Sequence, residues 1–92
     1  MAMADTIREK LTLALRPVAL EVTDESARHH GHSGSRPGGE THFNVRVVSN
    51  AFAGQSRVAR QRLVYGALAE EMKAQIHALA ITALTPGEVV KS

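Results

Sequence analysis

Histidine is the residue type in this 92-residue chain whose number and spacing suggest chemistry, because five copies occur and cysteine is absent. His29, His30 and His32 lie close together, His42 follows, and His77 stands apart. A neutral imidazole binds borderline metals and replaces cysteine in some iron–sulfur centres. The first three could close on a metal or belong to a solvated polar loop. His77 could be a ligand or a hydrogen-bonded histidine at the edge of the core.

Other chemistry is poorly supported by the sequence. The absence of cysteine excludes disulfides, thiol redox chemistry and a cysteine nucleophile. Asp24, Ser26 and His29 spell a catalytic triad, but they lie within six residues, at the start of a glycine-rich stretch that cannot hold a nucleophile rigidly. We therefore expect a protein that is not an enzyme. No apolar run is long enough to span a bilayer and no secretory signal pattern is present, which predicts a cytoplasmic protein without membrane contact.

Three arginines make the strongest positive cluster. The formal net charge is only +2, but Arg57, Arg60 and Arg62 occur in a stretch without acidic residues. On a helix Arg57 and Arg60 share a face, while Arg62 lies about 140° from Arg57. These arginines could contact nucleic acid phosphates, or they could form an ordinary solvated helix face.

The N-terminal quarter predicts a helix over 6–15. Thr6 and Glu9 fit a capping box, and Pro17 ends the helix because it disfavours the helical conformation of the preceding residue. The apolar stripe of this helix consists of Ile7, Leu11, Ala14 and Leu15.

Alternating apolar residues predict strands over 18–24, 42–47 and 77–84. A polar, glycine-rich loop over about 25–41 separates the first two strands, and a helix capped by Ser56 extends to about residue 74. Its apolar face consists of Val58, Tyr65, Leu68 and Met72, with Val64 beside them. The order helix, strand, strand, helix, strand predicts a single α+β domain in which helices pack on one face of a three-stranded sheet.

Several segments together resemble the BolA family of small α+β proteins. They include Leu20-Glu-Val-Thr-Asp-Glu-Ser26, Gly39-Glu-Thr-His-Phe43, Phe52-Ala-Gly54, Arg60-Gln-Arg62 with Val64-Tyr65, Ile76-His-Ala-Leu-Ala80 and Thr85-Pro86. The resemblance implies a fold related to class II KH domains with the order α-β-β-α-β. On this resemblance, we expect residues 1–92 to form one BolA-like domain with a core over about 6–88.

The resemblance also implies a metal cluster. Proteins similar to this one bind a monothiol glutaredoxin and share a bridging [2Fe–2S] cluster with its cysteine and with glutathione. The histidine of the Ile-His-Ala-Leu segment, His77, would be one ligand. The family pattern places the second ligand at His29, with His30 and His32 as alternatives. Because cysteine is absent, the resemblance implies the subgroup with histidine ligands, and we expect the isolated chain to bind no cluster.

Three functions follow as hypotheses. The leading one is a non-enzymatic adaptor in iron–sulfur cluster assembly, trafficking or iron sensing, monomeric or weakly dimeric without its glutaredoxin. The family resemblance also implies a DNA-binding transcriptional regulator, for which Arg57, Arg60 and Arg62 match the expected cations. Members of the family commonly have Arg-His-Arg where this chain has Gln61 between two arginines. A third hypothesis is metal sequestration by the loop histidines.

Overall fold

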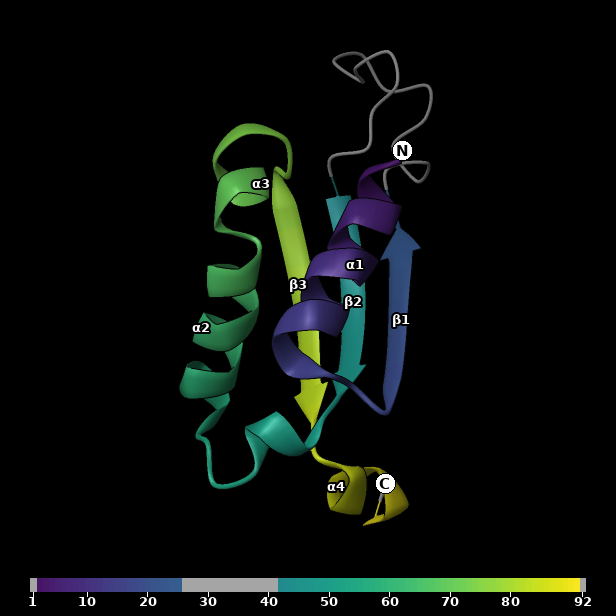
Figure 1. Ribbon diagram of the computed structural model, residues 1–92, viewed down its shortest axis with the longest axis vertical. Coiled ribbons are helices and arrows are strands. Elements are labelled where there is room, and N and C mark those ends of the chain that lie inside the picture. The colour runs from purple at the N-terminus through teal and green to yellow at the C-terminus, as the bar shows by residue number, and fades with distance from the viewer. Residues whose placement is uncertain (1, 26–41, 92) are drawn as a thin grey trace.

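Helices cover one face of a three-stranded sheet in the computed structural model, which describes residues 2–25 and 42–91 (Figure 1). This arrangement confirms the predicted α+β class. In chain order the elements are α1 (Met3–Leu15), β1 (Ala19–Asp24), β2 (His42–Val48), the 3₁₀ helix η2 (Asn50–Phe52), α2 (Arg57–Ala67), α3 (Ala69–Ala74), β3 (Ala78–Leu84) and α4 (Pro86–Lys91). Apart from Glu25, the predicted loop over about 25–41 lies outside the described residues.

The central strand of the sheet is β2. It pairs with β1 in an antiparallel ladder and with β3 in a parallel ladder. Parallel neighbours need a crossover connection, which α2 and α3 supply here. The parallel register places His42 opposite Ala78. Residue 77 therefore has no partner among the described residues of β2, and the strand predicted over 77–84 begins one residue later.

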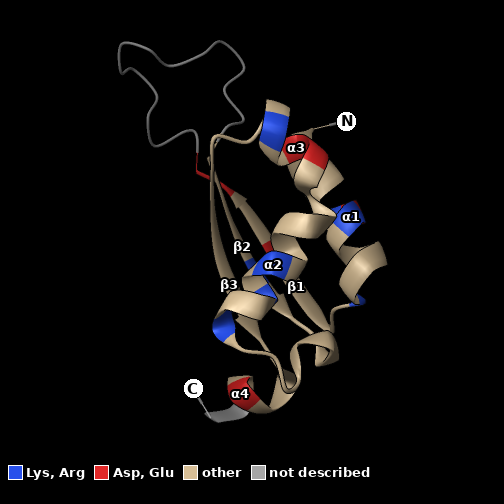
Figure 2. Ribbon diagram, turned by 90° about the vertical axis from the view of Figure 1, so that its left-hand side faces the viewer, with Lys and Arg blue, Asp and Glu red and all other residues tan. Residues whose placement is uncertain are grey.

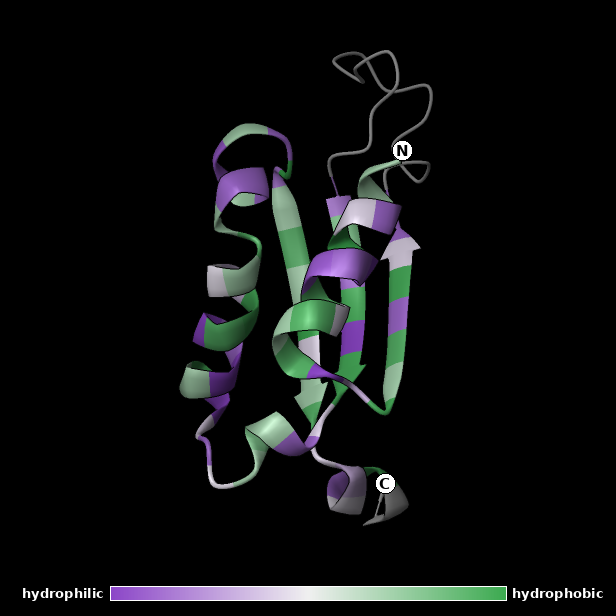
Figure 3. Cartoon of the chain, in the orientation of Figure 1, coloured by the Kyte–Doolittle hydropathy of each residue, from purple (hydrophilic) through white to green (hydrophobic). Residues whose placement is uncertain are grey.

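The core lies between the sheet and α1, α2 and α3. Hydrophobic and polar residues alternate along β1 and β2 (Figure 3), and less exposed residues alternate with exposed ones along most of β3. One side of each strand therefore faces the core. Phe43 and Phe52 are both buried, whereas the Tyr65 side chain stays partly exposed. The buried cluster consists of Ile7, Leu11, Leu15, Phe43, Val45, Val47, Phe52, Val64, Leu68 and Ile76.

The first helix begins earlier than the sequence predicts. Its N-cap is Ala2, which makes no side-chain cap hydrogen bond, and the backbone N–H of Thr6 already donates to the Ala2 carbonyl at 3.2 Å. Thr6 therefore lies within the first helical turns, and the predicted capping box with Glu9 is wrong. Ala14 is exposed, so the buried residues of α1 are Ile7, Leu11 and Leu15.

The end of α1 is held by a buried hydroxyl. Arg16 adopts a left-handed conformation with φ of 46° before Pro17, which confirms the predicted helix end. The fully buried Ser49 hydroxyl, just after β2, donates to the Leu15 carbonyl at 2.6 Å. The same oxygen accepts the Ala51 N–H at 3.1 Å and so caps η2. One side chain thus connects α1, β2 and η2.

The second predicted helix is broken at Leu68, where φ is −110° and ψ is 20°. The Ser56 hydroxyl accepts the Ala59 N–H at 3.1 Å, as predicted for the N-cap. Val64 and Leu68 are buried, but Val58 is 57% exposed, so the predicted apolar face was rotated from the true one. A hydrophobic pattern alone does not locate the break, because most residues on both sides of Leu68, apart from Gly66, are good helix formers.

Helix α3 is attached to α1 by a partly buried ion pair. Lys10 Nζ lies 2.6 Å from Glu71 Oε2, and the Glu71 side chain is only 9% exposed. The hydrogen bond from Lys10 lowers the pKa of the Glu71 carboxyl and raises the pKa of Lys10 itself. The second carboxylate oxygen, Oε1, is buried without a hydrogen-bond partner. This ion pair was not predicted from the sequence.

Candidate functional site

Two histidines meet at one end of the sheet. His42 is the first residue of β2, and His77 immediately precedes β3. Their ring centres are 5.3 Å apart and their planes make an angle of 66°, which is an edge-to-face arrangement. His77 is exposed and His42 is partly exposed. The sheet therefore presents a pair of imidazoles to solvent.

The strand register brings these two rings together. Paired residues in a parallel ladder lie side by side. Because His42 pairs with Ala78, His77, the residue before Ala78, lies close to His42. On the other side of β2, the N–H of Glu25 donates to the His42 carbonyl at 2.8 Å. The chain thus leaves the described region at Glu25 and re-enters it at His42, beside His77. The predicted ligands His29, His30 and His32 lie outside the described residues.

The separation of the rings suits two ligands of one metal. Imidazole nitrogens bind zinc at about 2.0–2.1 Å, which places two ring centres on one tetrahedral ion roughly 5 Å apart. The observed 5.3 Å agrees with this spacing. Within the described residues, however, no group of three or more histidine, cysteine, aspartate or glutamate side chains could hold a metal. A complete centre would therefore need ligands from a partner or from residues 26–41.

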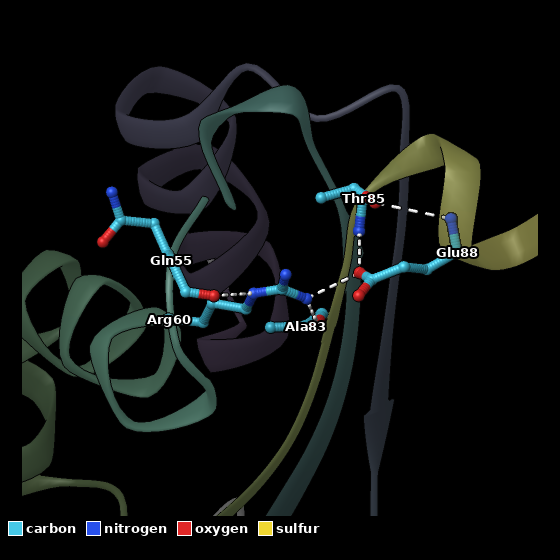
Figure 4. A network of polar contacts seen from close by, with 5 residues as sticks. All are labelled: Gln55, Arg60, Ala83, Thr85 and Glu88. Carbon is cyan, nitrogen blue, oxygen red and sulfur yellow. Dashed lines mark hydrogen bonds and ion pairs between the residues drawn. The ribbon is translucent and has the colours of Figure 1, made fainter. Parts of the chain in front are cut away.

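The three arginines differ in their surroundings. Basic positions occur along α2 (Figure 2). Arg57 and Arg62 are exposed, whereas the Arg60 side chain is only 14% exposed. Arg60 donates through Nε to the Gln55 carbonyl at 2.9 Å and through Nη1 to the Ala83 carbonyl at 3.1 Å (Figure 4). Arg60 therefore links α2 to β3, a role that the sequence analysis did not predict.

The same guanidinium anchors α4. Arg60 Nη1 donates to Glu88 Oε1 at 2.6 Å, and that oxygen also accepts the Thr85 N–H at 2.7 Å (Figure 4). The Glu88 N–H donates in return to Thr85 Oγ1 at 3.4 Å, so Thr85 and Glu88 form a capping box at the start of α4. The Arg60 hydrogen bond and the Thr85 N–H lower the pKa of Glu88 to about 2. Helix α4 was not predicted from the sequence, although Thr85-Pro-Gly-Glu88 has the spacing of a capping box.

Comparison with known proteins identifies the family. The model of the BolA family, described as BolA-like protein, matches residues 11–88. The chain belongs to the BolA-like family. It is 54% identical over 87 residues to SufE-like protein 1, chloroplastic/mitochondrial, of Arabidopsis thaliana, covering 90% of this chain but only 24% of that protein.

Two further relatives extend the comparison. The DNA-binding transcriptional regulator BolA of Escherichia coli is 45% identical over 85 residues, with 92% of this chain and 77% of the relative covered. The solved structure of BolA1 from Arabidopsis thaliana superimposes with a TM-score of 0.86 at 47% identity, covering 96% of both chains. These similarities agree with the resemblance found in the sequence.

The cytoplasmic location predicted for this BolA-like chain is not tested by the family assignment. No helix among the described residues is long and apolar enough to cross a membrane. The name of the Arabidopsis relative places that protein in chloroplasts or mitochondria. A cytoplasmic location is therefore still an expectation.

His42 is the site residue that the sequence analysis did not assign. It stands beside His77 only because β2 and β3 pair in parallel with this register. The Gly-Glu-Thr-His-Phe segment that carries His42 contributed to the family resemblance. A correct pairing of the two predicted strands would have been the signal, but alternation within one strand says nothing about its neighbour.

Proposed function

We propose that this BolA-like chain is a non-enzymatic adaptor that binds a monothiol glutaredoxin and shares a bridging [2Fe–2S] cluster with it. The observation that supports this function is the exposed imidazole pair formed by His42 and His77, 5.3 Å apart between ring centres. A site with two ligands is incomplete by itself and suits a cluster whose remaining ligands come from a partner. In this proposal the glutaredoxin cysteine and glutathione supply them.

The proposed role of the chain is to present two neutral imidazole nitrogens. His77 is the first ligand, and the second is His29, with His30 and His32 as alternatives. The structure adds His42 as a further candidate, because it is the described histidine whose ring contacts His77. Histidine ligation gives such a cluster a higher reduction potential than thiolate ligation alone and makes its binding dependent on pH.

An anaerobic titration of cluster-loaded monothiol glutaredoxin with this protein tests the proposal. We expect a new visible circular dichroism spectrum that saturates at a one-to-one ratio. His77→Ala should abolish that spectrum, and a His77→Ala protein that still produces it would contradict the ligand assignment. Because His77 is exposed, its replacement should leave the thermal midpoint nearly unchanged, which provides the control for folding.

Single alanine variants of the other histidines then identify the second ligand. If His42→Ala removes the new spectrum while His29→Ala retains it, His42 is the ligand. The reverse result assigns the role to His29. If every single variant apart from His77→Ala retains the spectrum, neighbouring histidines substitute for one another, and a double variant of His29 and His42 becomes the decisive sample.

DNA binding is the second candidate function. It is favoured by the name of the Escherichia coli relative, a DNA-binding transcriptional regulator, and by the exposed side chains of Arg57 and Arg62. Phosphate contacts predict that affinity falls as salt rises and that alanine at Arg57 or Arg62 reduces this salt dependence. Affinity that is insensitive to salt would contradict this function. Arg60→Ala is a poor test, because it also breaks the links from α2 to β3 and α4.

A further inference from the structure

Strand β3 is at the edge of the sheet. Its last residue, Leu84, shows which of its backbone groups point toward β2 and which point away. The Leu84 carbonyl accepts the N–H of Ser49, which follows β2, at 2.9 Å. Backbone groups of successive strand residues point to opposite sides, so the even-numbered residues of β3 bond to β2. Leu79, Ile81 and Ala83 therefore direct their N–H and C=O groups away from the sheet.

Side chains from α2 occupy two of these three carbonyls. Tyr65 Oη donates to the Leu79 carbonyl at 3.4 Å, and Arg60 donates to the Ala83 carbonyl at 3.1 Å. Both bonds agree with the outward direction deduced from Leu84. Between them, the N–H and C=O of Ile81 have no partner in the described part of the chain, and the N–H of Ala83 has none either. Between the Leu79 and Ala83 carbonyls, this edge thus keeps two N–H donors and one C=O acceptor available.

A groove of about 380 Å³ lies along this part of the edge. Ile81 to Leu84 form one wall, and Gln55, Arg57 and Gln61 form the other. In its lining, Oε1 of the Glu88 carboxylate already accepts hydrogen bonds from Arg60 and from the Thr85 N–H. Arg57, in contrast, makes no ion pair with the described residues. The groove therefore favours a ligand that offers carbonyl or carboxylate oxygens.

We propose that this groove binds an extended peptide segment of a partner protein, which adds to β3 as a fourth strand and places an acidic side chain against Arg57. A peptide in extended conformation offers N–H and C=O groups with the two-residue repeat that β3 presents. A nucleic acid strand lacks this repeat, and it would find only the partly exposed Tyr65 as an aromatic surface for its bases. A cavity of this size is within the range of roughly 300–1,000 Å³ that holds compact ligands.

The peptide site is independent of the proposed cluster site. The groove adjoins Ile81 to Leu84, whereas His77 precedes the other end of the same strand. A partner bound at the histidines and a peptide in the groove would thus occupy different ends of β3. The experiment is performed without glutaredoxin or metal, so its result does not depend on whether the cluster proposal is correct.

Amide chemical shifts of the ¹⁵N-labelled protein provide the test, with the acetylated and amidated pentapeptide Thr-Val-Glu-Val-Thr as the probe. We expect saturable changes in the amide chemical shifts of Ile81, Ala83 and the first turn of α2. Hydrogen exchange at the Ile81 and Ala83 amides should also become slower. A peptide N-methylated at all five residues lacks backbone N–H donors along its chain and should bind at least tenfold more weakly. Arg57→Glu should weaken binding of the unmodified peptide at least tenfold.

Arg62→Glu is the matched control, because it makes the same charge change on an exposed part of α2 outside the groove lining. It should change the affinity less than twofold. Equal effects of Arg57→Glu and Arg62→Glu would overturn the proposal, and so would equal binding of the N-methylated peptide. The proposal also fails if the Ile81 amide is already protected in the free protein, or if oligo(dT) of twelve nucleotides shifts these amides while the peptide does not.

Discussion

Replacing Ser49 with alanine should destabilise the fold more than the loss of one oxygen atom suggests. The hydroxyl is fully buried, and it satisfies the Leu15 carbonyl, one of the last four of α1, which lack partners within the helix. Leaving a buried acceptor unpaired costs about 1–3 kcal/mol. Losing the cap of η2, where Ser49 accepts the Ala51 N–H, costs about a further 1 kcal/mol. We therefore expect a loss of about 2–4 kcal/mol.

Urea and thermal unfolding followed by circular dichroism measure this loss. For a domain of this size, the expected loss lowers the melting temperature by about 8–30 °C. Ser56→Ala is the matched control, because it removes a single cap hydrogen bond at an exposed position. It should cost only about 1 kcal/mol. If Ser49→Ala costs no more than Ser56→Ala, the Leu15 carbonyl does not depend on this hydroxyl and the reasoning is refuted.

Two further predictions concern glycines and a carboxylate. Gly66→Ala should stabilise α2 by about 0.5–1 kcal/mol, because no atom lies within 4 Å of the added methyl group. Gly54→Ala should destabilise by about 1 kcal/mol, because its φ of 75° disfavours other residues, and urea unfolding of both variants should show these opposite signs. The pKa of Glu71 is lower in the folded state than its unfolded value of about 4.5. The ion pair between Glu71 and Lys10 therefore stabilises the fold fully above about pH 4.5. This stabilisation is lost as the pH falls through the lower pKa of the folded state. Urea unfolding should therefore find Glu71→Gln least stable relative to the parent near pH 7, and a difference that does not shrink toward pH 2 would contradict this linkage.

Local periodicity was sufficient to predict most of the fold. The alternation around Val45 and the three- and four-residue spacing of Ile7 and Leu11 identified the strands and the first helix, because one face of each element is buried. Features that depend on a single residue's surroundings were not predictable in this way. Tyr65 fits an apolar helical stripe, yet it is partly exposed because its hydroxyl reaches the Leu79 carbonyl at the sheet edge.

The candidate site shows the same limit. His77 was recognised because a short motif surrounds it, but His42 is a candidate only through the strand pairing that sets it beside His77. Arg60 and its neighbour Arg62 have the same side chain and similar surroundings in sequence. Their environments differ because Glu88, twenty-eight residues after Arg60 in the chain, folds back as part of α4. Long-range contacts therefore decide which charged residues are available for a partner.

The two edges of the sheet explain why β3, rather than β1, is the strand proposed to bind a peptide. Exposed strand edges promote unwanted pairing, and arginines at each edge reduce this risk. Arg8 Nη2 reaches the Val22 carbonyl on β1 at 3.5 Å, and Arg60 reaches the Ala83 carbonyl on β3. Arg8 is already paired with Asp5 at 2.9 Å, so its charge is largely compensated within α1. At β3, by contrast, the guanidinium of Arg57 lies in a groove beside unpaired backbone donors. Within residues 2–25 and 42–91, an acidic extended segment would therefore find both a matching edge and an unsatisfied positive charge only along β3.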